Sequence, residues 1–145
     1  MRRILVATDG SEAADRAVDY AAGLAKREGA DLLIANVIGG YGLPDGVFTR
    51  VIYTEQAPVK EMLDSMSAET LTKARERARA AGADSIQLES RVGEVAEAVI
   101  DIAKEKAVNA IVVGKRGAGP LQRLLLGSVS RKLVNLASVP VIVVP

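Results

Sequence analysis

The sequence predicts a single α/β domain built around a mainly parallel β-sheet. Apolar, β-branched runs alternate with segments of helical period along the chain, which is the pattern of βα units. The chain has 145 residues, and a single domain of this size buries about two-thirds of the surface of its unfolded chain. No internal repeat, low-complexity stretch or linker interrupts the pattern, so we expect one domain over residues 1–145.

Five apolar runs rich in valine and isoleucine predict the strands. They lie near residues 3–8, 31–38, 84–90, 109–114 and 140–144. The last run carries no charged side chain, and an apolar strand at the edge of a sheet invites pairing with another strand. We therefore expect the terminal strand, Val141–Val144, to pair with its own copy in a homodimer.

The first helix is expected near residues 11–29. Ser11 is a suitable N-cap, and Gly29 is a suitable end because glycine readily adopts the left-handed conformation that closes many helices. The apolar side chains recur at helical spacing and most are small, which predicts close packing on the sheet. The predicted inward face consists of Ala14, Ala17, Val18, Ala21, Leu24 and Ala25.

Three further helices are expected near residues 58–81, 94–106 and 128–137. Ser128 is expected to be the N-cap of the last one. The expected inward residues are Val59, Met62, Leu63 and Met66 in the second helix, Ala96, Val99, Ile100 and Ala103 in the third, and Leu133, Leu136 and Ala137 in the fourth. Residues 39–57 have no clean period and contain several glycines and Pro44, which predicts a long loop.

The composition disfavours several classes of function. The chain contains no cysteine and no histidine, so it lacks thiolate nucleophiles, disulfides and the usual general base near neutral pH. Only 3% of the residues are aromatic, so there are few platforms for stacking bases or flavins. Arg2 and Arg3 precede only a short strand, and no apolar run approaches the roughly 18 residues of a membrane helix. We therefore expect a cytoplasmic protein without a membrane span.

A glycine-rich loop follows the fourth predicted strand and leads into the last helix. Glycine lets backbone N–H groups approach an anion, and the first turn of a helix has unpaired N–H donors. Residues 107–145 hold five basic and no acidic side chains, which favours an anionic ligand. The candidate phosphate contacts are Gly114, Lys115, Arg116, Gly117, Gly119, Gly127, Ser128, Val129 and Ser130. The glycines also have a structural interpretation, as a strand-exit turn at Gly114 and a helix cap at Gly127.

Ala7, Thr8 and Asp9 end the first predicted strand. In open α/β sheets, ligands bind beyond the carboxyl ends of strands, where neighbouring crossovers diverge to opposite faces. If the first and fourth strands are neighbours, these residues share one crevice with Gly114. An aspartate at a strand-to-helix turn also often caps the backbone, so Asp9 has two interpretations. Asp9 is the one carboxylate expected near the phosphates, where it could hold Mg²⁺ or Mn²⁺; no other metal ligand is assigned.

Three segments resemble the universal stress protein family. GKRGAGPLQRLLLGS fits the family pattern GxxGx9GS, with 9 residues between Gly117 and Gly127. ILVATDGS near the start and the final PVIVV are also similar, so the resemblance spans the whole chain. It implies an adenine nucleotide alpha-hydrolase-like fold: a three-layer domain with four helices and a five-stranded parallel sheet in the order 3-2-1-4-5. It also implies homodimers formed through the last strand.

The resemblance further implies binding of ATP or another adenine nucleotide. The residues that would hold the phosphates are Gly114, Gly117, Gly127 and Ser128. Asp9 would lie by the ribose, and backbone groups of Val37 would meet the adenine. The chain departs from the family at Asn36, where members often have histidine, and at Lys115, where they often have a small or hydroxyl residue.

The leading functional hypothesis is an ATP-binding regulatory protein of the stress response, acting as a dimeric switch toward an unknown protein partner. The alternatives are a nucleotide-independent dimeric interaction module and a slow ATPase. With no histidine and no Walker loop, hydrolysis should be weak at most. The sequence lacks the paired acids of a receiver domain and the aromatic walls of a flavodoxin. Nucleic-acid binding is disfavoured because no aromatic residues are interleaved with the basic ones.

Overall fold

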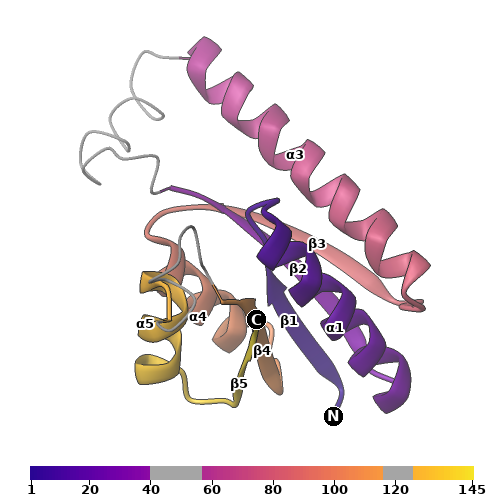
Figure 1. Ribbon diagram of the computed structural model, residues 1–145. Coiled ribbons are helices and arrows are strands. Elements are labelled where there is room, and N and C mark those ends of the chain that lie inside the picture. The colour runs from indigo at the N-terminus through magenta and orange to yellow at the C-terminus, as the bar shows by residue number, and fades with distance from the viewer. Residues whose placement is uncertain (40–56, 116–125) are drawn as a thin grey trace.

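The computed structural model describes residues 1–39, 57–115 and 126–145, which form five strands and four helices (Figure 1). In chain order they are β1 (Arg3–Ala7), α1 (Glu12–Glu28), β2 (Asp31–Ile38), α3 (Ala57–Ala80), β3 (Ile86–Val92), α4 (Val95–Glu105), β4 (Ala110–Gly114), α5 (Ser128–Leu136) and β5 (Val141–Val144). The predicted elements are confirmed, with ends shifted by at most two residues. Most of the predicted long loop, residues 40–56, lies outside the described residues.

The five strands form one parallel sheet in the order β3-β2-β1-β4-β5, as predicted. β1 lies at its centre, where Ile4 is in register with Leu32 of β2 and with Ala110 of β4. The helices form two outer layers, with α1 and α3 on one face of the sheet and α4 and α5 on the other (Figure 1). The chain is therefore the expected three-layer domain.

Alternate residues of each central strand supply two separate cores. Ile4 and Val6 of β1 point toward α1 and α3, whereas Leu5 points toward α4 and α5. This alternation follows from the two-residue period of a strand, and strands buried on both faces are continuously apolar. The sequences ILV in β1 and AIVV in β4 are such strands. Because β1 is buried on both sides, its end at the carboxyl edge of the sheet is held rigidly.

Helix α1 begins and ends as predicted. The Ser11 hydroxyl accepts a hydrogen bond from the Ala14 amide at 3.2 Å, and Gly29 closes the helix at φ 62°. The predicted inward alanines are buried, so α1 packs close to the sheet.

The predicted inward face of α3 is partly wrong. Met62 and Met66 were assigned to the core, but their side chains are 55% and 47% exposed. The buried stripe consists of Leu63, Ser67, Leu71, Ala74 and Ala78. Small side chains dominate this stripe because α3 lies close to the sheet, and the larger methionines point away from it. Val59 lies outside the residues whose side chains the structure describes.

The inward face of α5 also differs from the prediction at one residue. Leu136 is 56% exposed, whereas Leu133 is fully buried and packs with the α4 side of the core. The buried positions Ser130 and Leu133 lie three residues apart, which places Leu136 at the margin of the stripe. Within the described residues, no helix is both long and apolar enough to cross a bilayer.

Candidate functional site

A crevice is expected where the β1 and β4 crossovers diverge. β1 and β4 are neighbours, with Val6 in register with Val112. The chain leaves β1 for α1 on one face, and the segment after β4 leads to α5 on the other. This arrangement is the switch point at which open α/β sheets bind ligands. The condition that the sequence left open, that the first and fourth strands are neighbours, is therefore met.

The turn after β1 is held by a set of short hydrogen bonds. The Thr8 amide donates to the carbonyl of Ala35 at 2.9 Å, and the Thr8 hydroxyl accepts from the Gly10 amide at 3.1 Å. Oδ1 of Asp9 accepts from the Ser11 amide at 2.9 Å. Gly10 adopts φ 81°, which a glycine reaches without strain. The capping interpretation of Asp9 is thus confirmed, and its carboxylate is exposed at the end of β1.

Gly114 has a packing role at the end of β4. A Cβ atom at this position would lie 2.7 Å from the carbonyl carbon and oxygen of Ala13, in the first turn of α1. Only glycine allows this close approach, so the end of β4 packs directly against the start of α1. The next residue, Lys115, is half-buried, and its amide donates to the carbonyl of Val144 in β5 at 2.7 Å.

The start of α5 differs from the prediction by one residue. Gly127, not Ser128, is the N-cap, because Gly127 is extended (φ −66°, ψ 166°) and Ser128 is already helical and exposed. Gly127 contributes no side-chain cap, and the first turn of α5 contains no acidic residue. Ser130 is 1% exposed, and its hydroxyl donates to the Gly127 carbonyl at 3.1 Å. Val129 is half-buried and packs against the apolar core beneath α4 and α5.

The backbone of β2 extends past the end of β1. The amide of Leu32 donates to Ser85 on the β3 side, whereas the carbonyl of Ala35 accepts from Thr8 on the β1 side. Because hydrogen-bonding directions alternate along a strand, the backbone groups of Val37 face the β1 side. β1 ends at Ala7, in register with Ala35, so these groups face the space beyond β1. The Val37 side chain is 9% exposed and points toward α4 and α5.

Asn36 of β2 also lies at the carboxyl edge of the sheet. In the sequence it stands out as a departure from the family pattern. Its side chain is 7% exposed, and its Nδ2 donates to the carbonyl of Thr8 at 2.8 Å. Its Oδ1 accepts from the hydroxyl of Ser67 in α3 at 2.7 Å. A polar residue in the apolar run DLLIANVI was the available signal, because a buried amide must find hydrogen-bond partners.

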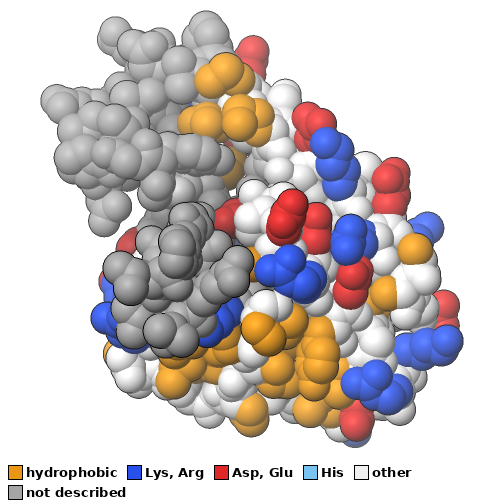
Figure 2. Space-filling model, viewed as in Figure 1, with side chains coloured by type: hydrophobic (Ala, Val, Ile, Leu, Met, Phe, Trp, Pro, Cys, Tyr) orange, Lys and Arg blue, Asp and Glu red, His pale blue; other side chains and the backbone are white. Residues whose placement is uncertain are grey.

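An open groove of about 470 Å³ runs along the outer side of the β1 turn, between α1 and α3. Asp9 and Gly10 line one end of it, with Met66 and Thr70 of α3 beside them. Charged pairs lie along these two helices (Figure 2). Arg77, at the other end, is bound to Asp19 at 2.8 Å, and this hydrogen bond raises its pKa. Its guanidinium is therefore engaged within the protein.

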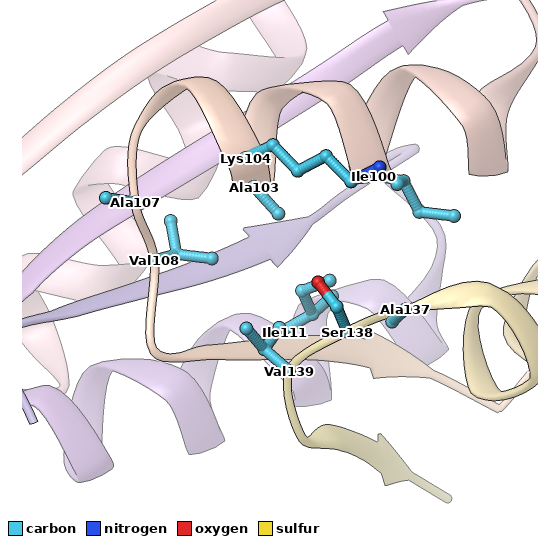
Figure 3. Close-up of a pocket in the computed structure, with 9 residues that line it drawn as sticks. All are labelled: Ile100, Ala103, Lys104, Ala107, Val108, Ile111, Ala137, Ser138 and Val139. Carbon is cyan, nitrogen blue, oxygen red and sulfur yellow. The ribbon is translucent and has the colours of Figure 1, made fainter.

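A smaller cavity of about 180 Å³ lies at the opposite end of the sheet (Figure 3). Ile100 and Ala103 of α4, Ile111 of β4 and Val139 line it, and Lys104 extends along α4 at its rim. None of the residues predicted to bind the nucleotide contributes to it, so it is separate from the crevice.

Three predicted contacts, Arg116, Gly117 and Gly119, lie outside the described residues. The others lie at the carboxyl edge of the sheet, on the ends of β1, β2 and β4 and on the first turn of α5. Across residues 1–39, 57–115 and 126–145, no three acidic side chains are grouped so that they could hold a metal ion. A divalent cation at Asp9 would thus need oxygen ligands from a bound phosphate.

Comparison with known proteins places the chain among relatives of the same length. The family model described as the universal stress protein family matches residues 1–145. The universal stress protein YxiE of Bacillus subtilis is 34% identical over 145 residues, which cover 98% of this chain and 97% of that protein.

Two solved structures of similar proteins contain adenine nucleotides. One is a universal stress protein in complex with cAMP, which is 29% identical, with a TM-score of 0.73 and coverage of 99% of this chain and 96% of that one. The other is the universal stress protein of Archaeoglobus fulgidus in complex with dAMP, which is 27% identical. Its TM-score is 0.71, and the match covers 100% of this chain and 98% of that one.

Proposed function

The chain belongs to the universal stress protein family, and from this premise we propose that it is a regulatory protein of the stress response that binds ATP in the crevice between β1 and β4. The observation that carries the proposal is the start of α5. Gly127 leaves the first amides of this helix without a side-chain cap, and the helix follows β4, the neighbour of β1 in the sheet. An anion at a helix N-terminus accepts these hydrogen bonds and is stabilised by the helix dipole.

The phosphates occupy the start of α5, with amides of Gly127, Ser128 and Val129 as donors. Ser128 contributes its exposed hydroxyl, whereas the Ser130 hydroxyl is engaged with the Gly127 carbonyl. Lys115, which follows β4, is on the same edge and adds positive charge. Gly114, Arg116, Gly117 and Gly119 complete the set that the family pattern suggests.

The nucleoside lies over the ends of β1 and β2. Asp9 meets the ribose with its exposed carboxylate, beside Ala7 and Thr8. The backbone groups of Val37 face the space beyond β1 and suit the donor and acceptor edge of an adenine. The cAMP and dAMP complexes of similar proteins support an adenine base. The Asp9 carboxylate is the group that would hold Mg²⁺ or Mn²⁺, which would supply positive charge to offset the negative charge of the phosphates.

The protein acts as a switch and not as an efficient enzyme. The chain has no histidine that could serve as a general base. Nucleotide binding instead changes the population of states that a dimer offers to its protein partner. The dimer forms through β5, an apolar strand at the edge of the sheet, and hydrophobic side chains gather over it (Figure 2). The cytoplasmic location expected from the sequence stays a prediction.

Isothermal titration with ATP, ADP, AMP and cAMP, with and without Mg²⁺, tests the proposal. Gly127→Val should abolish binding, because valine adopts φ −66° and ψ 166° but shields the amides of α5 with its branched side chain. Ser138→Val is the matched control, since Ser138 is exposed beyond the other end of the same helix.

Saturable binding to the wild type and to Ser138→Val, but not to Gly127→Val, supports the crevice. Equal affinity of Gly127→Val and the wild type would place the nucleotide elsewhere. No binding by the wild type at millimolar ATP would favour the nucleotide-independent interaction module. Chromatography with light scattering, comparing the wild type with Val143→Lys, tests the dimer through β5.

A further inference from the structure

Three rows of side chains cross the face of the sheet that α1 and α3 cover, and the third row is polar. The first two rows are Ile4–Leu32–Ile86 and Val6–Ile34–Leu88, all in register. The third row continues the register at the carboxyl edge with Thr8, Asn36 and Ser90. The change from apolar to polar therefore occurs in the row next to the candidate site.

Among the described buried side chains of α3, one is polar, and it lies opposite the polar row. Ser67 is 3% exposed and belongs to the buried stripe of α3, between Leu63 and Leu71. Its hydroxyl donates to Oδ1 of Asn36 at 2.7 Å and lies 2.9 Å from the hydroxyl of Ser90. Nδ2 of Asn36 then donates to the Thr8 carbonyl at 2.8 Å. Helix α3 is thus linked by side-chain hydrogen bonds to the last residue before Asp9.

Side-chain hydrogen bonds of Thr8 and Asp9 hold the turn that follows β1. The Thr8 hydroxyl accepts from the Gly10 amide at 3.1 Å, and Asp9 accepts from the Ser11 amide at 2.9 Å. Thr70 of α3 lies beside the same turn: its Cγ2 would be 3.6 Å from a Cβ atom added at Gly10, and both residues line the groove between α1 and α3. The orientation of the turn therefore depends on where α3 lies.

A purely apolar third row would bury the same surface without fixing an orientation. Hydrogen bonds between buried side chains are directional, and a partly satisfied network is costly, so a satisfied one favours a single arrangement. Among the described buried side chains, no polar atom lacks a hydrogen-bond partner. The Ser67–Asn36–Thr8 chain consequently allows one register of α3 against the β1 turn.

We propose that Asn36 and Ser67 are positioning residues for the nucleotide, which hold the Thr8–Ser11 turn in its binding conformation and couple it to α3. This inference rests on the proposed function, because the turn carries Asp9, the proposed ribose contact. Ser67 acts through Asn36 and not by contact with the ligand. Since the coupling is reciprocal, a bound nucleotide also stabilises the position of α3.

The test variant is Ser67→Ala, which removes the α3 end of the chain of hydrogen bonds. Titration with ATP should show a loss of affinity of about two- to tenfold, the effect of one net hydrogen bond. In the nucleotide-free protein, hydrogen exchange at the Gly10 and Ser11 amides should accelerate by a similar factor, about two- to tenfold. Ser67→Thr keeps the hydroxyl and should restore both.

Two controls separate positioning from general stability. Ser65→Ala makes the same change at an exposed position of the same helix and should leave affinity and exchange unchanged. Leu71→Ala removes a buried side chain of α3 outside the polar row, and should lower the melting temperature without changing the affinity for ATP. An equal loss of affinity in Leu71→Ala and Ser67→Ala would overturn the proposal.

The two readouts also separate this inference from the proposed function. Should the wild type bind no adenine nucleotide, the proposed function fails, and the exchange rates alone decide the positioning role. Faster exchange at Gly10 and Ser11 in Ser67→Ala, but not in Ser65→Ala, supports that role. Unchanged exchange in Ser67→Ala overturns it, whether or not ATP binds.

Discussion

Two helices begin at the crevice, and they satisfy their first backbone amides in different ways. At the start of α1, Ser11 caps the helix with its hydroxyl, and Glu12 and Asp15 place negative charge in the first turn. At the start of α5, Gly127 provides no cap, and the first turn has no acidic side chain. Both helix starts carry the same partial positive charge, so the difference lies in what already neutralises it.

Under the proposed function, this difference separates a structural side, the start of α1, from a ligand side, the start of α5. The start of α1 is satisfied by its own side chains and would repel a second anion. Within the described residues, no side chain caps the start of α5, so it is the side on which phosphates would be stabilised. The two sides are held together where Gly114 of β4 meets the backbone of Ala13. Variants at these positions can test each side separately.

The largest effect on stability is expected from Gly114→Ala, which should disturb the packing of β4 against the start of α1. The new Cβ would lie 2.7 Å from backbone atoms of Ala13, which cannot move without shifting α1. We expect a loss of about 1 to 3 kcal/mol in the free energy of unfolding, measured by urea denaturation.

Gly23→Ala is the matched control, because its Cβ would meet only the flexible end of Arg27, at 3.4 Å. Alanine in this helical position should increase stability by up to about 1 kcal/mol. A stability for Gly114→Ala as high as that of the wild type would contradict the packing role of Gly114.

Gly127→Asp should make the start of α5 resemble that of α1. The new carboxylate can cap the helix and would repel phosphate, so ATP affinity should fall about tenfold or more while the helix is slightly stabilised. Titration and thermal unfolding measure the two opposite effects. Ser138→Asp adds the same charge beyond the other end of α5, and should leave the affinity near the wild-type value.

Ser11→Ala should show the converse, a loss of stability without a loss of binding. Removing the hydroxyl leaves the Ala14 amide without its 3.2 Å partner, which costs about 1 kcal/mol at an N-cap. Urea denaturation should detect this loss, and the affinity for ATP should stay within about twofold of the wild type. A large loss of affinity would show that the start of α1 belongs to the ligand side.

The smallest effect on stability is expected from Ser128→Ala, because Ser128 is exposed and is not the N-cap. The free energy of unfolding should change by less than about 0.5 kcal/mol, as for most surface substitutions. A loss close to that of Ser11→Ala would show that Ser128 caps α5 after all. In a separate titration, a decrease in ATP affinity without a loss of stability would indicate a contact of the Ser128 hydroxyl with phosphate.

The elements were predictable because their signals are local. A run such as AIVV in β4 is apolar on both faces, and Ser11 and Gly29 mark the ends of α1 by their own chemistry. The sequence allowed both Ser128 and Gly127 as the cap of α5 and did not decide between them. The choice depends on where Leu133 and the buried hydroxyl of Ser130 meet the core.

Local sequence also misassigned the face of α3. Met62 and Met66 are the larger apolar side chains, but they are exposed, whereas Ser67 is buried and its hydroxyl donates to Asn36. The partner of a buried polar residue comes from a distant part of the chain, so its identity cannot be read from a single segment. The same holds for Gly114, whose lack of a side chain is explained only by the approach of Ala13.

The sequence by itself determined the alternation of strands and helices, the chemistry of the two helix starts and the absence of a histidine base. These properties belong to single residues or short windows, which keep their propensities wherever the segment lies. The strand order that places β1 beside β4 was implied by the family resemblance and is confirmed, whereas only the tertiary structure decided that β4 packs onto the backbone of α1 and that Ser67, Asn36 and Thr8 form one chain of hydrogen bonds. Contacts between segments distant in the sequence depend on packing and register, which no single segment encodes.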